Sequence, residues 1–266
     1  MVVVSHNRAE LLRKCLASLE RSHGREKLQF IVVDNGSTDE SPDLESEFPK
    51  VRFFRLPKNF GLTKAMNIGW RSAEAEYSLF LHEDTEVEPE AIGRLADVLD
   101  ADSAASAVCP LLVDEAGQPA PQLGTLPPDG RWRPAEPAGS EPVAVEYPRG
   151  AALMVRAFVI KSTRQIDERY GQFGGDADLA ALIGKASRKI LLVPQARVRH
   201  YGGGENSPLR QADFLLGRAV FLGKHQGFLA GLRARVAAVL GPLVSFRFSE
   251  VRHTLSGQKI DGAQIE

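Results

Sequence analysis

An apolar run, residues 30–33, ends abruptly in a carboxylate, an amide, a glycine and two hydroxyl side chains, residues 34–38. A buried strand ends in this way when it brings polar side chains to the edge of an α/β sheet, where ligands bind beyond the carboxyl ends of the strands. Asp34 at such an edge can accept hydrogen bonds from a base or a ribose. An ordinary turn that caps a following helix has the same composition. The run therefore predicts a strand. Whether the polar residues after it form an ordinary turn or a ligand-binding site has to be judged from the rest of the sequence.

Strand-like and helix-like segments alternate through the first two hundred residues. Apolar, β-branched runs predict strands at residues 2–5, 28–34, 51–56, 77–81, 105–109, 150–155 and 190–193. Between them, apolar residues recur at helical spacing in residues 11–19 and 62–72, and Pro89 suits the first turn of a further helix. This rhythm predicts an α/β fold with a mostly parallel sheet, right-handed crossovers and helices on both faces.

Two segments break the rhythm. Residues 114–148 hold eight of the sixteen prolines and little periodicity, so we expect a long surface loop beside the active site; a domain linker is the alternative. We expect the first domain to span residues 1–208 and a basic, amphipathic helical extension to span residues 209–266. That extension either packs on the first domain or touches anionic lipid.

Composition excludes several classes of protein. A net charge of −1 offers no global field for nucleic acid, and the two cysteines, Cys15 and Cys109, have no neighbouring ligand that would suggest a zinc site. We interpret both as small buried hydrophobes in a reducing compartment. No leader is visible, and the longest near-apolar stretch, residues 236–246, is too short to span a bilayer. We therefore expect a cytoplasmic protein, with peripheral contact at the inner membrane face as the alternative.

Polar clusters follow several of the predicted strands. They lie at residues 5–8, 34–37, 82–84 and 199–204, and a fifth, residues 59–67, lies between a strand and a helix. Because the carboxyl ends of parallel strands meet at one edge of a sheet, we expect these clusters to converge.

The order and the sequences of these clusters resemble those of glycosyltransferase family 2, which has the GT-A fold. The resemblance runs from residue 2 to about residue 204 and is nearest to the rhamnosyltransferase-like branch. It is carried by residues 2–8 (VVVSHNR), 32–39 (VVDNGSTD), 59–61 (NFG), 67–69 (NIG), 81–87 (LHEDTEV), 150–156 (GAALMVR), 166–170 (IDERY), 176–179 (DADL) and 193–204 (VPQARVRHYGGG).

The resemblance implies an inverting, metal-dependent transfer of one sugar from a nucleotide-diphosphate donor to a glycan or a lipid-linked acceptor in cell-surface polysaccharide synthesis. Asp84 stands where the family binds a divalent cation, Mg²⁺ or Mn²⁺, which a hard carboxylate oxygen suits. His200 adds a metal ligand or a diphosphate contact, and Glu83 can support the site. The alternatives are a helix-capping acid for Asp84 and a surface histidine for His200.

The nucleotide is expected along the polar edge of the sheet. Its predicted contacts are Ser5, Asn7, Arg8, Asp34, Asn35, Ser37, Asn59 and Asn67. Arg8 and Asn67 are equally compatible with a solvated helix start and a polar helix residue. The resemblance places the general base at Asp176, with Asp178 as support; capping carboxylates at a helix N-terminus would look the same.

The chain also departs from the family pattern. His82-Glu83 precedes Asp84 where the family often has Asn-Pro or a second aspartate, Gly175 replaces a glutamate, and His6 replaces an aromatic residue. These departures keep open a catalytically weak member that acts as a binding or scaffold protein. An oxidoreductase is set aside because the first turn lacks G-x-G-x-x-G, a nucleotidyltransferase because no basic glycine-rich loop follows the first strand, and processive synthesis because no Gln-x-x-Arg-Trp block is present.

Overall fold

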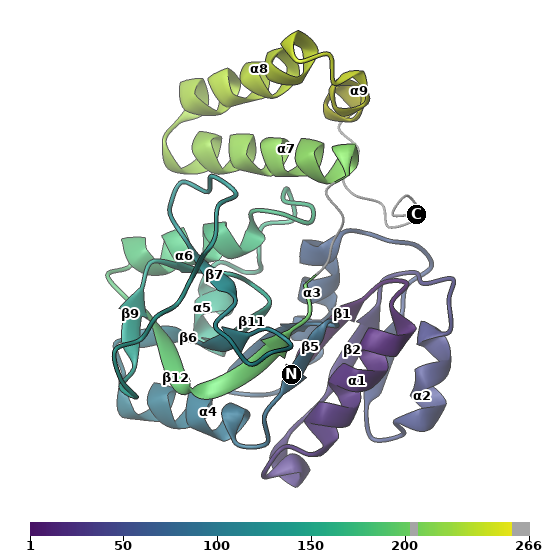
Figure 1. Ribbon diagram of the computed structural model, residues 1–266, viewed down its shortest axis with the longest axis vertical. Coiled ribbons are helices and arrows are strands. Elements are labelled where there is room, and N and C mark those ends of the chain that lie inside the picture. The colour runs from purple at the N-terminus through teal and green to yellow at the C-terminus, as the bar shows by residue number, and fades with distance from the viewer. Residues whose placement is uncertain (203–206, 257–266) are drawn as a thin grey trace.

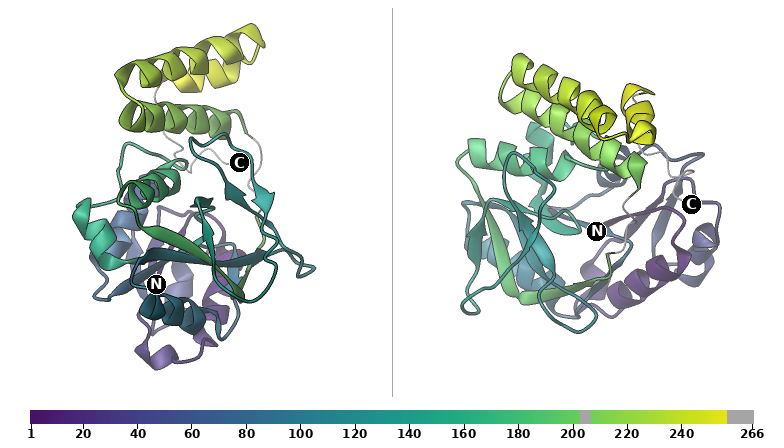
Figure 2. Two further views of the ribbon diagram at one scale, coloured as in Figure 1. Left: turned by 90° about the vertical axis from the view of Figure 1, so that its left-hand side faces the viewer. Right: turned by 45° about the horizontal axis from the view of Figure 1, so that its top comes forward.

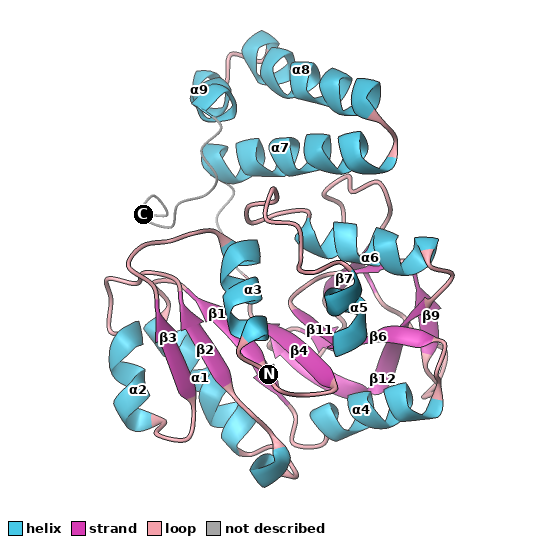
Figure 3. Cartoon of the chain, turned by 180° about the vertical axis from the view of Figure 1, so that it is seen from behind, coloured by secondary structure: helices cyan, strands magenta, loops and turns pink. Residues whose placement is uncertain are grey.

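A mixed sheet with helices on both faces forms the body of the protein (Figures 1 and 3). The computed structural model describes residues 1–202 and 207–256. Its first half contains the parallel strands β1 (Val2–Ser5), β2 (Ile31–Asp34), β3 (Arg52–Arg55) and β4 (Tyr77–His82), in the spatial order β3-β2-β1-β4. Ser5 pairs with Asp34 and Val4 with His82, so the polar ends of three strands lie side by side.

Side-chain alternation along these strands explains the two helical layers. Val3 and Val32 pack on one face with α1 (Ala9–Glu20) and α4 (Ala91–Ala101). Val4, Ile31 and Val33 point to the other face and pack against α3 (Leu62–Arg71). Successive side chains of a strand point to opposite faces, so one apolar run supplies both cores. Short helical segments, η1 (Arg25–Lys27), η2 (Ser41–Asp43) and α2 (Leu44–Glu47), complete this half.

The second half of the sheet contains antiparallel strands. β11 (Ala152–Arg156) lies antiparallel between β4 and β6 (Ala105–Val113), and β12 (Lys189–His200) continues the sheet parallel to β6. β5 (Thr85–Val87) pairs antiparallel with the end of β12 and so brings the segment after β4 to His200. Helices α5 (Ala157–Ser162) and α6 (Gly175–Lys185) follow β11 in the chain. The α/β class and the predicted strands are thus confirmed.

Two expected segments differ from the structure, one in its length and one in its type. The strand expected at residues 190–193 continues to His200, because a register shift between Val193 and Arg197 lets the pairing with β6 pass Pro194. Residues 114–148, expected as a loop, hold β7 (Pro121–Gly124), β8 (Arg133–Pro134), β9 (Val143–Val145) and β10 (Tyr147–Pro148). β9 joins β12, and the other three form a small sheet. Strands of two to four residues are too short to show a period.

Three helices lie outside the sheet body (Figure 2). α7 (Pro208–His225) lies across the body, and α8 (Phe228–Val244) and α9 (Phe248–Ser256) lie beyond it. Ser207 caps α7 by accepting a hydrogen bond from the Arg210 amide, and Pro208 occupies the first turn. Within the described residues, no helix combines the length and the hydropathy that crossing a bilayer requires. Cys15 and Cys109 are buried free thiols, as expected.

Candidate active site

A cavity of about 550 Å³ lies where the polar strand ends meet. Nine of the predicted residues line it: Ser5, Asn7, Arg8, Asn35, Asn59, Glu83, Asp84, Asp176 and His200. The remaining four, Asp34, Ser37, Asn67 and Asp178, do not. The sheet therefore brings described residues from all four strand-end clusters to one cavity, as their positions predict; Gly203 and Gly204 of the last cluster lie outside the described residues.

Three side chains at one end of the cavity form a cluster that fits a metal ion. Ligand atoms of His82, Asp84 and His200 all lie within 4.8 Å of one another. Asp84 Oδ1 is 3.4 Å from His200 Nε2 and 3.9 Å from His82 Nδ1. This oxygen is buried and no hydrogen bond reaches it. A buried carboxylate oxygen costs free energy when it is left unsatisfied, and a cation between the two imidazoles would satisfy it.

Charge around the cluster keeps Asp84 ionised. Burial alone would raise its pKa, but the contact with His200 and the charges of His82 and Arg8 lower the pKa to about 2. Arg8 Nη1 lies 3.3 Å from Asp84 Oδ2. Burial lowers the pKa of the His82 imidazole to about 4, so this ring is neutral at neutral pH, as a metal ligand must be. Burial, and then the charge of Asp84, raise the pKa of Glu83 to about 7.

Amide and hydroxyl side chains fix the loops of the opposite wall. The Asn35 side-chain amide donates to Asn59 Oδ1 at 2.9 Å, and its oxygen accepts from the Phe60 amide. Asn7 Oδ1 accepts from the Thr38 amide at 2.7 Å. Asp34 accepts from the Ser37 amide at 3.1 Å, so these two residues support the loop from behind and do not face the cavity.

Ser5 is a wall residue whose hydroxyl group is unsatisfied. Its hydroxyl oxygen is buried at the end of β1 and has no hydrogen-bond partner in the structure. Since a buried hydroxyl is normally hydrogen-bonded, this atom is available to a bound molecule.

Asp176 enters the cavity from the first turn of α6. Its Oδ1 accepts from the Tyr147 hydroxyl at 3.0 Å, and its Oδ2 accepts from the Gly150 amide at 3.1 Å. Burial raises the pKa of this carboxyl, although those hydrogen bonds act in the opposite direction. A buried, partly desolvated carboxylate that is held in one orientation is suited to accept a proton.

The residue before Asp176 is crowded. A Cβ atom built on Gly175 would lie 3.0 Å from Thr63 Oγ1 and 3.5 Å from Ile166 Cγ2. The glycine therefore packs against α3, and a glutamate here would require Thr63 to move. This contact gives the departure from the family pattern a structural reason.

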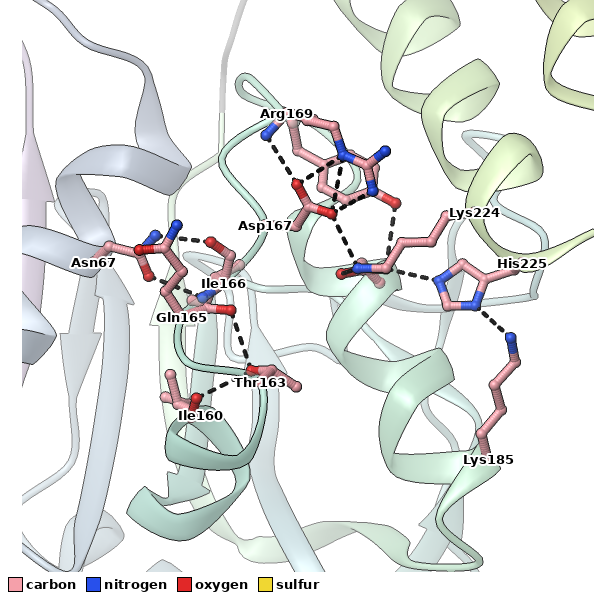
Figure 4. A network of polar contacts seen from close by, with 12 residues as sticks. Asn67, Ile160, Thr163, Gln165, Ile166, Asp167, Arg169, Lys185, Lys224 and His225 are labelled. Carbon is pink, nitrogen blue, oxygen red and sulfur yellow. Dashed lines mark hydrogen bonds and ion pairs between the residues drawn. The ribbon is translucent and has the colours of Figure 1, made fainter. Parts of the chain in front are cut away.

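Asn67 and Asp178 hold the frame of the site; Figure 4 shows Asn67 and the two α7 residues, Lys224 and His225, that contact Asp178. Asn67 is buried and its amide exchanges two hydrogen bonds with the backbone of Ile166, at 2.8 and 3.0 Å. Asp178 Oδ2 lies 2.8 Å from Lys224 Nζ, and its Oδ1 lies 2.7 Å from His225 Nε2. Asp178 thus ties α6 to α7 and is not among the residues that line the cavity.

Sequence reasoning missed several residues of the cavity. His82 belongs to the predicted cluster of residues 82–84 but is not among the expected metal ligands, although its position at the end of β4 signals a ligand. Trp132 and Tyr147 come from the segment expected beside the site, and their rings pack 4.9 Å apart. Arg149, Arg210 and Arg218 also line the cavity, two of them from α7, and no local pattern marks these.

These arginines make one side of the cavity cationic. Burial, and then the charges of Arg8 and Arg149, lower the pKa of the Arg210 guanidinium. Neighbouring positive charges that repel one another favour the binding of an anion between them.

Comparison with known proteins agrees with this arrangement. The model of the family described as Glycosyl transferase family 2 matches residues 1–158, which is more than half of the chain. The chain belongs to glycosyl transferase family 2. It is 27% identical over 234 residues to the N-acetylglucosaminyl-diphospho-decaprenol L-rhamnosyltransferase of Mycobacterium tuberculosis, covering 76% of this chain and 75% of that protein. The succinoglycan biosynthesis protein ExoO of Rhizobium meliloti is 30% identical over 109 residues, 40% of this chain and 31% of that protein.

Solved structures show the same fold. GalNAc-T7, crystallised with UDP, GalNAc and Mn²⁺, superposes with a TM-score of 0.68 at 18% identity, over 83% of this chain and 46% of that chain. TarS 1–349 of S. aureus, in complex with UDP, superposes with a TM-score of 0.61 at 16% identity, over 88% of this chain and 67% of that chain. The family 2 chain therefore has the GT-A architecture expected from its sequence.

Proposed function

We propose that this family 2 chain is an inverting, metal-dependent glycosyltransferase that moves a single sugar from a nucleotide-diphosphate donor to a glycan or lipid-linked acceptor. The observation that supports the proposal is that two chemically different groups of side chains line the same cavity. His82, Asp84 and His200 form a cation site, and the separately held carboxylate of Asp176 forms a basic site. An inverting transfer needs both a stabilised leaving group and a base for the acceptor hydroxyl.

The nucleoside would lie against the wall formed by Ser5, Asn35 and Asn59. The open Ser5 hydroxyl supplies one hydrogen bond, and the amide pair keeps the loop in place. Asp34, Ser37 and Asn67, expected as direct contacts, act on the nucleoside in this proposal through the backbone that they hold.

A divalent cation, when bound, would act as a Lewis acid on the diphosphate as negative charge develops there. His82, Asp84 and His200 would hold it, and Arg8 would share the diphosphate charge. Two imidazoles and one carboxylate are a softer set of ligands than Mg²⁺ prefers, so we infer Mn²⁺ over Mg²⁺.

The acceptor would approach Asp176. Its carboxylate would take the proton of the attacking hydroxyl, while Tyr147 and the Gly150 amide hold the carboxyl in position. The relative from M. tuberculosis is named for an acceptor linked through a diphosphate to decaprenol. An acceptor of that kind would suit the cationic side formed by Arg149, Arg210 and Arg218. A role in cell-surface polysaccharide synthesis follows if the acceptor is of this type.

A thermal-shift screen of UDP-, dTDP- and GDP-sugars, with and without Mn²⁺, tests the proposal. A ligand that binds only the folded protein raises its melting temperature. One donor should raise it more with Mn²⁺ than without, and Asp84→Ala should remove that difference. Absence of any metal-dependent shift with all donors would refute metal-dependent donor binding.

One observation favours a second function. Gly175 occupies a crowded position at which the family carries a glutamate. The lack of that glutamate suits a weak enzyme that binds a nucleotide sugar or a glycan as a scaffold. Donor hydrolysis or transfer that disappears in both Asp84→Ala and Asp176→Asn would exclude this function. Donor binding without turnover would support it.

A further inference from the structure

The outer face of α8 is a continuous apolar stripe. Leu229, Leu232, Val236, Leu240 and Leu243 follow one another at intervals of three or four residues and are all exposed. That spacing places them on one side of a helix. Isolated exposed leucines are common, but five in one line form a contiguous surface that needs an explanation.

The inner face of α8 is already used. Its buried residues, Gly231, Ala238 and Pro242, recur at helical spacing, and Gly231 meets Gly223 of α7 at close range. A Cβ atom on Gly231 would lie 2.6 Å from the Gly223 Cα atom. Because the exposed stripe lies on the opposite side of the helix from these buried residues, it points away from α7. α8 itself lies beyond α7 as seen from the sheet body (Figure 2).

The turn between α8 and α9 extends the same surface. Phe246 is 80% exposed and Phe248 is 61% exposed, with ring centroids 6.2 Å apart. Leu255 of α9 is also exposed. Aromatic rings at the ends of an apolar helical face are typical of segments that lie in the interface of a bilayer.

The exposed charges of lysine, arginine, aspartate and glutamate on this hairpin are all positive. Residues 228–256 contain four arginines, Arg233, Arg235, Arg247 and Arg252, all exposed. Their single acid, Glu250, is buried and paired with Arg247 at 3.0 Å. A surface that combines apolar residues with an excess of arginines complements the headgroups and acyl chains of an anionic leaflet. A second copy of this chain fits less well, because a twofold contact would bring the arginines of two identical patches together.

We propose that the outer face of the α8–α9 hairpin binds anionic lipid membranes, with the stripe and the two phenylalanines in the interface and the arginines at the headgroups. α7 then separates the membrane from the cavity by one helical layer, because Arg210, Phe214 and Arg218 of α7 line the cavity while Gly223 contacts α8. Membrane binding would bring the cavity close to a lipid-linked acceptor, and this consequence rests on the proposed function.

Vesicle co-sedimentation tests the proposal on the full chain, with neither donor nor metal. The protein should bind phosphatidylcholine vesicles that contain phosphatidylglycerol, bind far less to phosphatidylcholine alone, and dissociate as salt is raised. Leu240→Glu should lower binding about tenfold, because a carboxylate then replaces apolar surface in the interface. Arg233→Gln and Arg252→Gln should each lower it about fivefold, from about 1 kcal/mol per cationic residue near the membrane.

Phe158→Glu is the matched control. Phe158 lies on α5 of the body and is 51% exposed, the same fraction as Leu240. The Phe158→Glu variant should bind vesicles like the wild type, and circular dichroism should show that Phe158→Glu and Leu240→Glu are both folded. Asp84→Ala should also bind normally, so a failure of donor binding and a failure of membrane binding are separate results.

Three results would overturn the proposal. The first is a wild type that does not bind anionic vesicles. The second is equal binding by Leu240→Glu and the wild type. The third is a wild-type dimer in light scattering that Leu240→Glu dissociates while vesicles stay unbound, which would make the hairpin a contact between copies of the chain.

Discussion

Gly36 is expected to be irreplaceable for two separable reasons, and Gly36→Ala measures their sum. Its φ of +83° lies in the left-handed region, where a Cβ atom costs about 1–2 kcal/mol. That Cβ would also lie 2.4 Å from the Lys58 carbonyl carbon and 2.8 Å from the Asn59 amide nitrogen. Both are backbone atoms, so the clash is relieved only if the loop that carries Asn59 moves.

Gly24→Ala isolates the first reason. Gly24 has a φ of +70° and no atom within 4 Å of its Cβ position. Its cost should be about 1 kcal/mol, since part of the strain is offset by the smaller entropy of the unfolded chain. Overpacking adds about 1–3 kcal/mol at Gly36, so the two variants should differ by about 2 kcal/mol.

Urea unfolding gives both free energies by linear extrapolation. Gly36→Ala should also weaken donor binding, because displacement of Asn59 breaks its 2.9 Å hydrogen bond with Asn35. Gly93→Ala, within α4 and with no atom near the new Cβ, should stabilise the protein by up to about 1 kcal/mol. Equal losses at Gly24 and Gly36 would refute the packing argument for this loop.

Three more substitutions have definite expected outcomes. Asp176→Asn should lower kcat about a hundredfold or more. Because burial raises the pKa of Asp176, the activity of the wild type should fall as the pH drops through that raised pKa. The variant lacks the buried charge, so urea unfolding should show that it is no less stable than the wild type at neutral pH. Asp178→Ala should cost about 3–5 kcal/mol in the same assay, since Lys224 and His225 lose their buried partner, and a loss below about 1 kcal/mol would contradict this. His82→Phe should raise the Mn²⁺ concentration needed for half of the thermal shift with donor; an unchanged titration would remove His82 from the site.

The sheet and most of the site could be predicted because strand ends combine two signals. An apolar run that stops at Ser5, Asp34 or His82 fixes both the strand and the edge at which its last side chain lies. Parallel pairing then brings such residues together without knowledge of distant contacts. His200 follows the same rule at the end of β12.

The direction of each polar side chain was not predictable in this way. Asp34 and Ser37 lie on the right loop, yet they bond to each other, because a single turn decides whether a carboxylate faces the cavity or its own backbone. Arg210 and Arg218 depend on the packing of α7 over the body, which no local pattern specifies. Among the short strands of residues 121–148, β9 depends on pairing with the distant β12, and β7, β8 and β10 pair with one another.

The length of α7 matters because its two ends contact different parts of the molecule. Its last cavity residue is Arg218, whereas Ala219 and Gly223 lie against Gly231 of α8 and Lys224 contacts Asp178 of α6. Deleting one residue between these points would turn everything downstream by about 100° while leaving the cavity wall in place. Lys224 and His225 would turn away from Asp178, and the stripe on α8 would face sideways. Across related sequences, the stretch from Arg218 to Lys224 should therefore tolerate substitutions far better than insertions or deletions, because its length keeps the two ends of the helix in phase.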